Sequence, residues 1–206
     1  MSDVNDWLSR AAVWRFGALL FREPGPERPG ELQALAPLLP AELRAAAQPI
    51  VAEVSLRNDR YFAVLGPGGC AATESAYDLA AMANRGPLLA EVSAFYESFS
   101  YPVRLSSDLA PDHLVVELDF LGFLALKVAY ALYEGKGDER DVAESAYSDF
   151  RDRHPCFWLD ALRNRLHDVE DSAFARAADW LCEALAGEAR LPASDAGLQT
   201  RDPTHA

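Results

Sequence analysis

The amino-acid sequence predicts an all-α fold, a single compact helical domain of about nine helices. Apolar residues recur at spacings of three and four along most of the chain, which is the period of an amphipathic helix. No segment shows the alternation of apolar and polar residues that a half-buried strand would have. Half of the 206 residues are apolar and a quarter are charged, as in ordinary folded proteins. A chain of this length can bury a sizeable core without disulfides or a structural metal.

The first helix is expected to end near Arg22. Apolar residues keep helical spacing until the stretch "EPGPERPG" interrupts the pattern. Ser2, Asp3 and Asn5 are candidate N-caps, because short polar side chains accept hydrogen bonds from the first free amides of a helix. Residues 31–56 are again helical in pattern, but their prolines predict two or three short helices.

The stretch "LGPGGCAAT" predicts a turn-rich loop over residues 65–73. Its glycines also admit a phosphate loop that would bind a nucleotide or a pterin. The lysine and hydroxyl of a GxxxxGK[ST] loop are absent, so a plain turn is the favoured interpretation. Further along, Gly86-Pro87 opens a helix whose apolar stripe extends to Phe99.

Residues 101–110 are expected to form a hinge, because "SYPVRLSSDLAP" has no helical period and carries a proline near each end. The hinge divides one helical domain, residues 1–190, into two lobes, an N-terminal half (1–100) and a C-terminal half (111–190). It would allow two chains to exchange halves, so we expect a monomer or an exchanged dimer. Residues 191–206 hold few large apolar side chains and are expected to be a disordered tail.

The C-terminal half is expected to contain a strongly apolar helix over residues 114–133, and Pro111 would suit a first helical position. The segment is nearly long enough to span a bilayer. Glu117, Asp119 and Lys127 would each cost about 2.5 to 3.5 kcal/mol near the membrane centre, however. We therefore expect a helix buried in the protein core. Three further helical patterns follow, at residues 142–153, 157–166 and 174–185.

The charge balance limits the kinds of partner. Lysine and arginine total 19 against 32 aspartates and glutamates, which gives a formal net charge of −13. That balance repels nucleic acids and anionic membranes and favours a cationic partner. The three cysteines lack zinc or CxxC spacing and are expected to be buried thiols. The N-terminus places acidic residues ahead of its apolar part, unlike a signal peptide, so we expect a cytoplasmic protein without stable membrane insertion.

Ionisable residues gather where the long apolar helix begins, in "APDHLVVELDF". A helix that is apolar almost all round is surrounded by others, so each ionisable group must be hydrogen-bonded, paired, or open to a cleft. In one interpretation Asp112 caps the helix and His113 bonds a loop carbonyl. Glu117 and Asp119 then pair internally with an arginine. Arg104 and Arg85 are the candidate partners.

In a second interpretation the same acidic groups line a cleft, reachable from solvent, that accepts a partly apolar peptide carrying arginine. Guanidinium groups form charge-assisted and often bidentate bonds with carboxylates. Tyr77, Tyr96 and Phe120 would supply the apolar wall of that cleft. Residue types alone leave both interpretations open.

The segment "PDHLVVELDFLGFL" resembles the PDHLxxELxFL signature of the TorD/DmsD/NarJ group of redox-enzyme maturation chaperones. Upstream, "ESAY" and "AEVSAFYESFSYPV" are similar to that group's ESxY and xEVxxFYxxFG elements, and "HPCFW" follows downstream. The resemblance covers roughly residues 65–185. The chain departs from the pattern at "SSDLAPDH", where members often carry Glu-Pro or Gly-Glu, and at Ser100-Tyr101, where a glycine is usual.

The resemblance implies a cytoplasmic chaperone that binds the twin-arginine signal segment of a molybdenum-cofactor oxidoreductase catalytic subunit. The chaperone would hold that subunit for cofactor insertion and assembly before export, with no cofactor of its own. Two alternatives are a NarJ-like assembly factor for a non-exported molybdoenzyme and a small-ligand or nucleotide-binding helical protein. The residues that we expect to bind the peptide are Asp112, His113, Glu117, Asp119, Phe120, Glu74, Ser75, Tyr77 and Tyr96.

An enzyme is not expected, because no convincing catalytic set is present. His113, His154 and His167 each have an acidic or thiol neighbour in the sequence, but adjacent side chains on a helix do not face one another. The GxSxG, HExxH and dinucleotide-binding patterns are also missing.

Overall fold

The structure is a computed structural model that describes residues 3–56, 58–66, 68–102, 109–169 and 172–189. These residues form helices and turns without a strand, and one isolated β-bridge joins Thr73 to His113. The all-α prediction is confirmed. In chain order the elements are α1 (Val4–Phe21), α2 (Arg28–Leu35), η1 (Ala36–Leu38), α3 (Ala41–Leu56), α4 (Asn58–Leu65), η2 (Glu74–Ala76), α5 (Leu79–Ala83), α6 (Gly86–Ser98), α7 (Leu114–Tyr133), α8 (Gly137–Arg153), α9 (Pro155–His167) and α10 (Ser172–Ala189).

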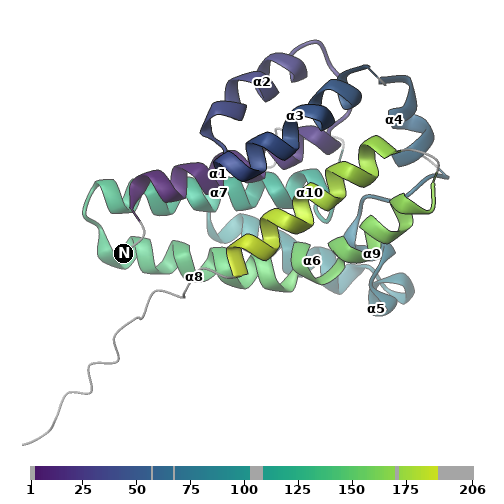
Figure 1. Cartoon of the computed structure of the whole chain (residues 1–206). Helices are drawn as coiled ribbons and strands as arrows, with labels where there is room; N and C mark the ends of the chain where they lie inside the picture. Colours follow the sequence, from purple (N-terminus) through teal and green to yellow (C-terminus); the bar gives the residue numbers. More distant parts are fainter. Residues whose placement is uncertain (1–2, 57, 67, 103–108, 170–171, 190–206) are drawn as a thin grey trace, which may run out of the picture.

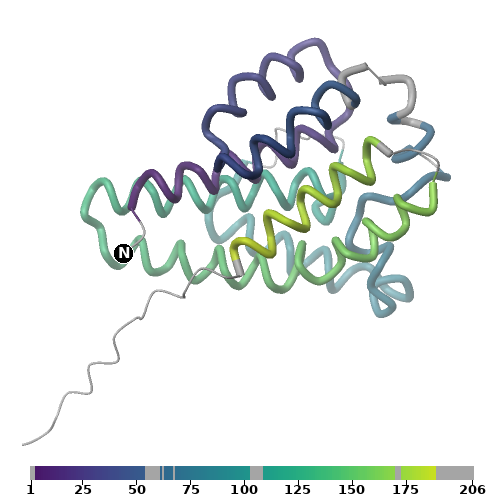
Figure 2. The backbone as a smooth tube through the Cα atoms, viewed as in Figure 1, coloured from purple at the N-terminus to yellow at the C-terminus, as the bar shows by residue number. Residues whose placement is uncertain are grey.

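Helix α7 lies in the middle of the fold and packs against both α1 and α8 (Figure 1). Gly122 of α7 lies against Ala11 of α1, whereas Gly17 of α1 lies against Leu118 of α7, so the two helices run antiparallel. A Cβ atom at Gly122 would lie 3.4 Å from the Ala11 carbonyl oxygen. Glycine therefore allows the two backbones to approach closely. Helix α10 packs against α9 and α3 and covers the other side of α1 (Figure 2).

The core is built around tryptophans. All four are buried, at most 2% exposed. Trp14 Nε1 donates to the Tyr147 hydroxyl at 2.7 Å, and Trp180 Nε1 donates to the Leu43 carbonyl at 2.8 Å. The indole donors of Trp14 and Trp180 are thus satisfied, as is usual for buried polar groups.

One continuous buried cluster contains apolar side chains from α1 and α6 as well as from α7, α8, α9 and α10. Both proposed halves of the chain contribute to it, so the described part of the molecule shares one core. The expected hinge falls largely on residues 103–108, and the expected tail, 191–206, falls on residues 190–206; both segments lie outside the described residues. The division at 101–110 stays a prediction.

The expected limits of the first helix are confirmed. Asp3 is the N-cap of α1 and accepts a hydrogen bond from the Asp6 amide at 2.9 Å, and Arg22 is the C-cap. The region after it forms α2, η1 and α3, as the prolines predict, but α3 continues through Pro49. Pro49 is exposed, and a carbonyl left without a helical partner on that side can bond to water.

None of the described helices is long and apolar enough to cross a membrane, which agrees with the prediction that α7 is a core helix. Cys70 is buried and Cys182 half-buried, but Cys156 is exposed. The expectation of buried thiols is wrong for Cys156, because it lies in the first turn of α9 on the side that faces solvent.

Candidate functional site

The ESAY and PDH segments form one unit. The Leu114 amide donates to the Ala72 carbonyl at 2.9 Å, and the Glu74 amide donates to the Asp112 carbonyl at 2.9 Å. These bonds make the antiparallel bridge between the loop before η2 and the turn before α7. Two motifs distant in sequence are thus joined through their backbones.

The turn before α7 sets the start of that helix. The His113 amide donates to the Ala110 carbonyl at 3.0 Å, and His113 is the N-cap, with Nδ1 accepting from the Val115 amide at 3.2 Å. Burial lowers the pKa of His113 to about 4, although nearby Asp112 opposes the shift. The imidazole is therefore neutral at pH 7 and free to accept. The predicted cap at Asp112 is wrong, and Pro111 precedes the helix because the chain turns there to pair with the upstream loop.

Asp112 ties two further segments to this turn. Its carboxylate is 0% exposed; Oδ2 accepts from the Ser75 amide at 3.1 Å, and Oδ1 pairs with Arg85 Nη2 at 2.6 Å. Burial alone would raise the pKa of Asp112, but the bonds from Arg85 and Ser75 outweigh it and hold the pKa below its usual value. Arg85 was expected to pair with Glu117 or Asp119, and it pairs with Asp112 instead. The expected alternative partner, Arg104, lies outside the described residues.

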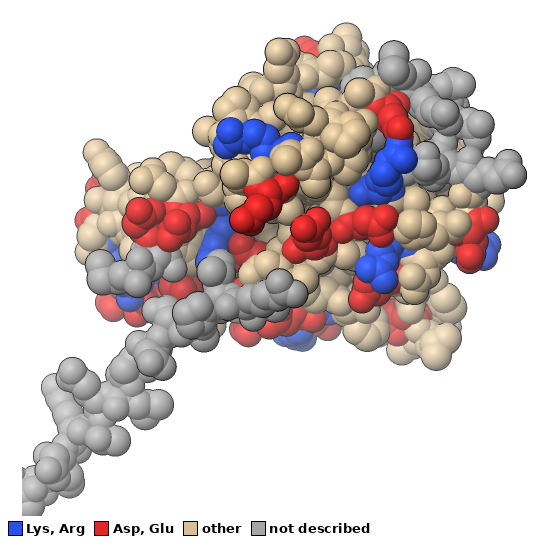
Figure 3. Space-filling model, viewed as in Figure 1, with Lys and Arg blue, Asp and Glu red and all other residues tan. Residues whose placement is uncertain are grey.

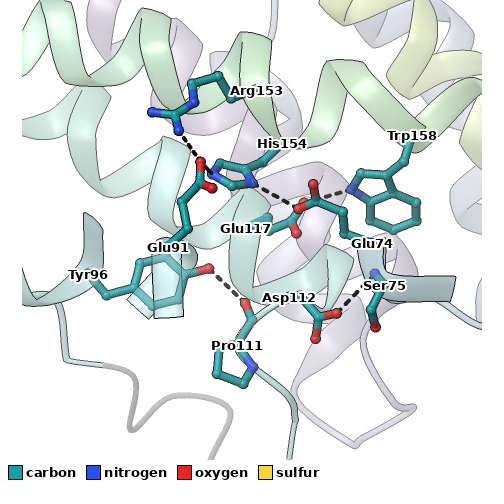
Figure 4. Close-up of polar contacts among 10 residues, drawn as sticks. All are labelled: Glu74, Ser75, Glu91, Tyr96, Pro111, Asp112, Glu117, Arg153, His154 and Trp158. Atoms are coloured by element: carbon teal, nitrogen blue, oxygen red, sulfur yellow. Dashed lines mark hydrogen bonds and ion pairs between the residues drawn. The ribbon is translucent and has the colours of Figure 1, made fainter. Parts of the chain in front are cut away.

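A buried polar cluster lies beside Asp112 (Figure 4). His154 Nδ1 lies 2.9 Å from Glu74 Oε2, and Trp158 Nε1 donates to Glu117 Oε2 at 3.1 Å. Burial, followed by the neighbouring Glu74 carboxylate, raises the pKa of Glu117 well above its ordinary value. Its surroundings thus favour the protonated form of Glu117. We call Glu74, Ser75, Asp112, Glu117, His154 and Trp158 the motif network, because ESAY, PDHLVVELDFL and HPCFW each contribute to it.

The motif network is closed on one side by α6 and α8. Arg153 pairs with Glu91, whose carboxylate also lies 3.8 Å from His154 Nε2 (Figure 4). Tyr96 is 2% exposed and donates its hydroxyl to the Pro111 carbonyl at 2.8 Å. Helix α6, which carries the xEVxxFYxxF element, is thus fastened to the same turn.

Two predicted site residues lie elsewhere. Asp119 is 9% exposed and pairs with Arg15 Nη1 at 2.7 Å, which fastens α1 to α7. Phe120 is fully buried, with its ring centroid 4.8 Å from those of Tyr96 and Phe150. The structure therefore brings together seven of the nine predicted residues, all but Asp119 and Phe120, around the turn before α7.

The prediction that the acidic groups are reachable from solvent is wrong. Asp112 and Glu117 are 0% exposed and Glu74 is 2% exposed, because partners within the chain hold them. His113 and Tyr77 are half-buried, and Tyr77 stacks on Trp158 with 5.4 Å between ring centroids. The peptide-binding role of these residues stays a prediction.

Three network partners were missed by sequence reasoning. The sequence suggested Arg85 for the wrong acid. It gave His154 only as a histidine outside any convincing catalytic set, and it placed Trp158 only in the helical pattern of residues 157–166. Their contacts span up to 80 positions, so no local spacing could have revealed them. The position of "HPCFW" inside the range covered by the resemblance was the one available signal.

Exposed apolar side chains border the motif network. Leu79 is 84% exposed and Met82 60% exposed on α5, which packs against η2, and Phe157 is 59% exposed next to Trp158. We call Leu79, Met82 and Phe157 the apolar rim. Exposed large apolar side chains are a common feature of protein-binding surfaces.

The charged surface does not mark a single acidic groove on the face that Figure 3 shows. Acidic side chains are spread over several elements there, with basic side chains between them. The net charge of −13 therefore acts as a diffuse field on this face.

The glycines of the GPGG loop are explained by the turn that ends α4. Gly68 has a φ of +88°, and a Cβ at Gly69 would lie 2.3 Å from the Val64 carbonyl oxygen. The Cys70 amide donates to that same carbonyl.

Among the residues that the structure describes, no group of His, Cys, Asp or Glu side chains could hold a metal ion.

Comparison with known families decides the classification. Residues 28–164 match the family described as "Nitrate reductase delta subunit". The chain belongs to this family. The matched range contains α2 to most of α9, and hence the whole motif network and the apolar rim.

Three proteins that are similar in sequence to this chain are assembly chaperones by name. The chain is 34% identical over 135 residues to the selenate reductase assembly chaperone protein of Thauera selenatis, covering 65% of this chain and 68% of the relative. It is 35% identical over 112 residues to the chlorate reductase assembly chaperone protein of Ideonella dechloratans, covering 53% and 57%. It is 32% identical over 80 residues to the perchlorate reductase assembly chaperone protein of Dechloromonas aromatica (strain RCB), covering 39% and 35%. The last two alignments span less than two thirds of those relatives. No solved structure matches the chain.

Proposed function

We propose that this chain is a cytoplasmic assembly chaperone for a molybdenum-cofactor reductase and that it binds the N-terminal segment of the reductase's catalytic subunit. Its family and the names of its relatives support an assembly role and a non-catalytic one. The client is a reductase of the selenate, chlorate or perchlorate type. The twin-arginine character of the bound segment is the finer part of the proposal.

The observation that carries the proposal is the position of the apolar rim on a rigid frame. The motif network connects η2, the turn before α7 and the start of α9 through buried hydrogen bonds. Leu79, Met82 and Phe157 project from that frame into solvent. An extended or helical segment with an apolar stretch can bury its side chains against them.

The predicted site residues then act in two ways. Glu74, Glu117 and Asp112 are too deeply buried to meet a client without a local change, so they fix the frame. His113 and Tyr77 are half-buried and border the surface. The net charge of −13 raises the rate at which a basic segment encounters this surface.

Binding of this kind suits an assembly role. A client segment held on the chaperone is withheld from the export machinery while the cofactor is inserted, and its release needs no chemical step. A non-exported client would be held through the same apolar contacts without a requirement for adjacent arginines.

Calorimetry with a synthetic peptide tests the proposal. The peptide carries two adjacent arginines followed by an apolar run, and its control replaces both arginines by alanine. We expect binding in the micromolar range, about −8 kcal/mol, that weakens at least tenfold with the control. Equal binding of both peptides would support the non-exported client, and absence of binding by either would contradict the proposal.

A further inference from the structure

The ion pair between Arg85 and Asp112 is unequally buried. Asp112 is 0% exposed, whereas the Arg85 side chain is 44% exposed, and Nη2 lies 2.6 Å from Oδ1. The guanidinium therefore reaches the carboxylate from the solvent side. It covers a buried negative charge whose other oxygen is held by the Ser75 amide.

Arg85 is attached to a short connection rather than to the body of a helix. It lies between α5 and α6, where its backbone is the N-cap of α6. Asp112 is its one side-chain partner among the described residues. Rotation of the side chain into water would thus break this single contact and leave the helices in place.

The ion pair between Arg15 and Asp119 is harder to exchange than the pair at Asp112. Arg15 binds Asp119 while it also lies 3.6 Å from Glu31, and it belongs to the central part of α1. Its removal would leave a contact between α1 and α7 incomplete. The pair at Asp112 is the more easily exchanged, since its arginine is the more exposed and has fewer partners.

We propose that Arg85 occupies, in the free chain, a guanidinium subsite at Asp112 that an arginine of the client segment takes over on binding. The proposal rests on the proposed function, because it names the chemistry by which the same surface selects its client. One guanidinium replaces another on the same carboxylate, so Asp112 has a cationic partner both in the free chain and in the complex, and the costly state in which it is buried without one is little populated. The displaced Arg85 moves into water.

The apolar rim lies where such a client would continue. Met82 and Leu79 precede Arg85 by three and six positions and are 60% and 84% exposed. An arginine at Asp112 places the neighbouring residues of the client beside these side chains. The preferred ligand is therefore a segment in which arginine is followed closely by apolar residues.

Occupation of the subsite by Arg85 should lower the affinity of the chain for its client. When an internal group occupies the subsite, the apparent affinity of a ligand equals its intrinsic affinity multiplied by the fraction of molecules whose subsite is empty. Removal of the occupant lifts that penalty. Weakened binding ensures that a short basic segment without the apolar run is not retained.

Calorimetry on variants tests the subsite. Arg85→Gln should bind the Arg-Arg peptide about tenfold more tightly than the wild type. Arg140→Gln is the matched control, because it removes the same charge from an exposed ion pair on α8 and should leave affinity unchanged. Asp112→Asn should abolish the gain when combined with Arg85→Gln. Unchanged or weaker binding by Arg85→Gln, with a wild type that binds, would overturn the subsite while leaving the proposed function intact.

Nuclear magnetic resonance on the wild type keeps the test independent of variant stability. The Arg85 guanidinium protons should exchange slowly in the free chain, because Asp112 holds them, and rapidly once the peptide is saturating. Continued slow exchange at saturation would overturn the subsite. Absence of binding by the wild type and Arg85→Gln alike would instead contradict the proposed function, on which the subsite rests.

Discussion

At the scale of the residue, the buried ionisable groups near the start of α7 differ in which protonation state their surroundings favour. Arg85 and the Ser75 amide bind Asp112 and favour its ionised form, whereas burial and the neighbouring Glu74 carboxylate raise the pKa of Glu117 and favour its protonated form. His113 stays neutral because burial disfavours the imidazolium. The protonation states follow from environment rather than from residue type.

The imidazole of His113 should make stability depend on pH on the acid side. Its folded pKa, about 4, lies below the unfolded value of 6.5, so the unfolded chain binds the proton first as pH falls. Stability is then complete above pH 6.5 and lost as pH falls toward 4, by roughly 1 to 3 kcal/mol. His113→Asn keeps an N-cap without titrating, and urea unfolding at several pH values should show a smaller loss.

A matched control is His167→Asn, which changes an exposed histidine paired with Asp179. It should retain most of the wild-type loss. An identical acid loss in His113→Asn and wild type would contradict the assignment of a neutral cap.

The raised pKa of Glu117 should make stability change with pH in the opposite direction. The folded chain keeps the proton to a higher pH than the unfolded chain, so wild-type stability should decline as pH rises above about 4.5. Glu117→Gln mimics the neutral acid and should be more stable than the wild type at pH 8 and similar at pH 4. Glu97→Gln, which changes an exposed carboxylate of α6 and leaves Glu117 in place, is the control that should keep the wild-type decline. A Glu117→Gln variant that is less stable than wild type at pH 8 would show that the carboxylate is ionised.

At the scale of the element, periodicity predicts helices well and their long-range partners poorly. The limits of α1 and the start of α6 follow from N-caps, prolines and apolar spacing, all of which are local. The predicted bounds of α7, residues 114–133, are confirmed, but its cap is His113 rather than Asp112, because the turn at 110–113 is fixed by backbone bonds to residues near position 73. The spacing of apolar residues predicts which side chains of a helix face the core, but it does not predict which distant residues they contact.

The same limit applies to the candidate site. The resemblance pointed to the correct segments, and seven of the predicted residues do gather around one turn. Their burial could not be inferred, since it depends on Arg85, His154 and Trp158, which approach from distant parts of the sequence. A polar residue at a helix start is equally consistent with a cap, a buried pair and an open cleft.

The turn between α4 and η2 yields a prediction at this scale. Gly69→Ala places a Cβ against the Val64 carbonyl oxygen, a backbone atom that cannot move aside cheaply. We expect a loss of about 1 to 3 kcal/mol in the free energy of unfolding, typical of a damaging core or turn substitution. Gly30→Ala in α2 meets nothing within 4 Å and should gain up to about 1 kcal/mol from helix propensity. Thermal denaturation of both variants measures the difference, and a neutral Gly69→Ala would show that the turn tolerates a side chain.

At the scale of the whole molecule, a rigid helical frame carries an exposed apolar surface at the place where its family motifs meet. The core is continuous from α1 to α10, and the motif network fastens η2, the turn before α7 and α9 to it. The apolar rim is thus presented without the need for client binding to order it. Preorganisation of this kind lowers the entropy lost on association.

A surface variant separates client contact from stability. Leu79→Ser removes an 84% exposed leucine of the apolar rim, and Leu38→Ser removes a 56% exposed leucine of η1 as the control. The first should weaken binding of the Arg-Arg peptide by about fivefold to thirtyfold, the effect of about 1 to 2 kcal/mol. Melting temperatures of both should stay near that of the wild type, because exposed side chains contribute little to the core. Equal affinities for the two variants would place the client elsewhere.

Hydrogen exchange on the complex tests the central claim most directly. On addition of the Arg-Arg peptide, amides of residues 79–86 and of the turn at 110–114 should become protected, together with those at the start of α9. Amides of α1 and of the C-terminal half of α7, which lie away from the motif network, should exchange as in the free chain. Protection confined to α1 or to the end of α7, with residues 79–86 unchanged, would contradict the account.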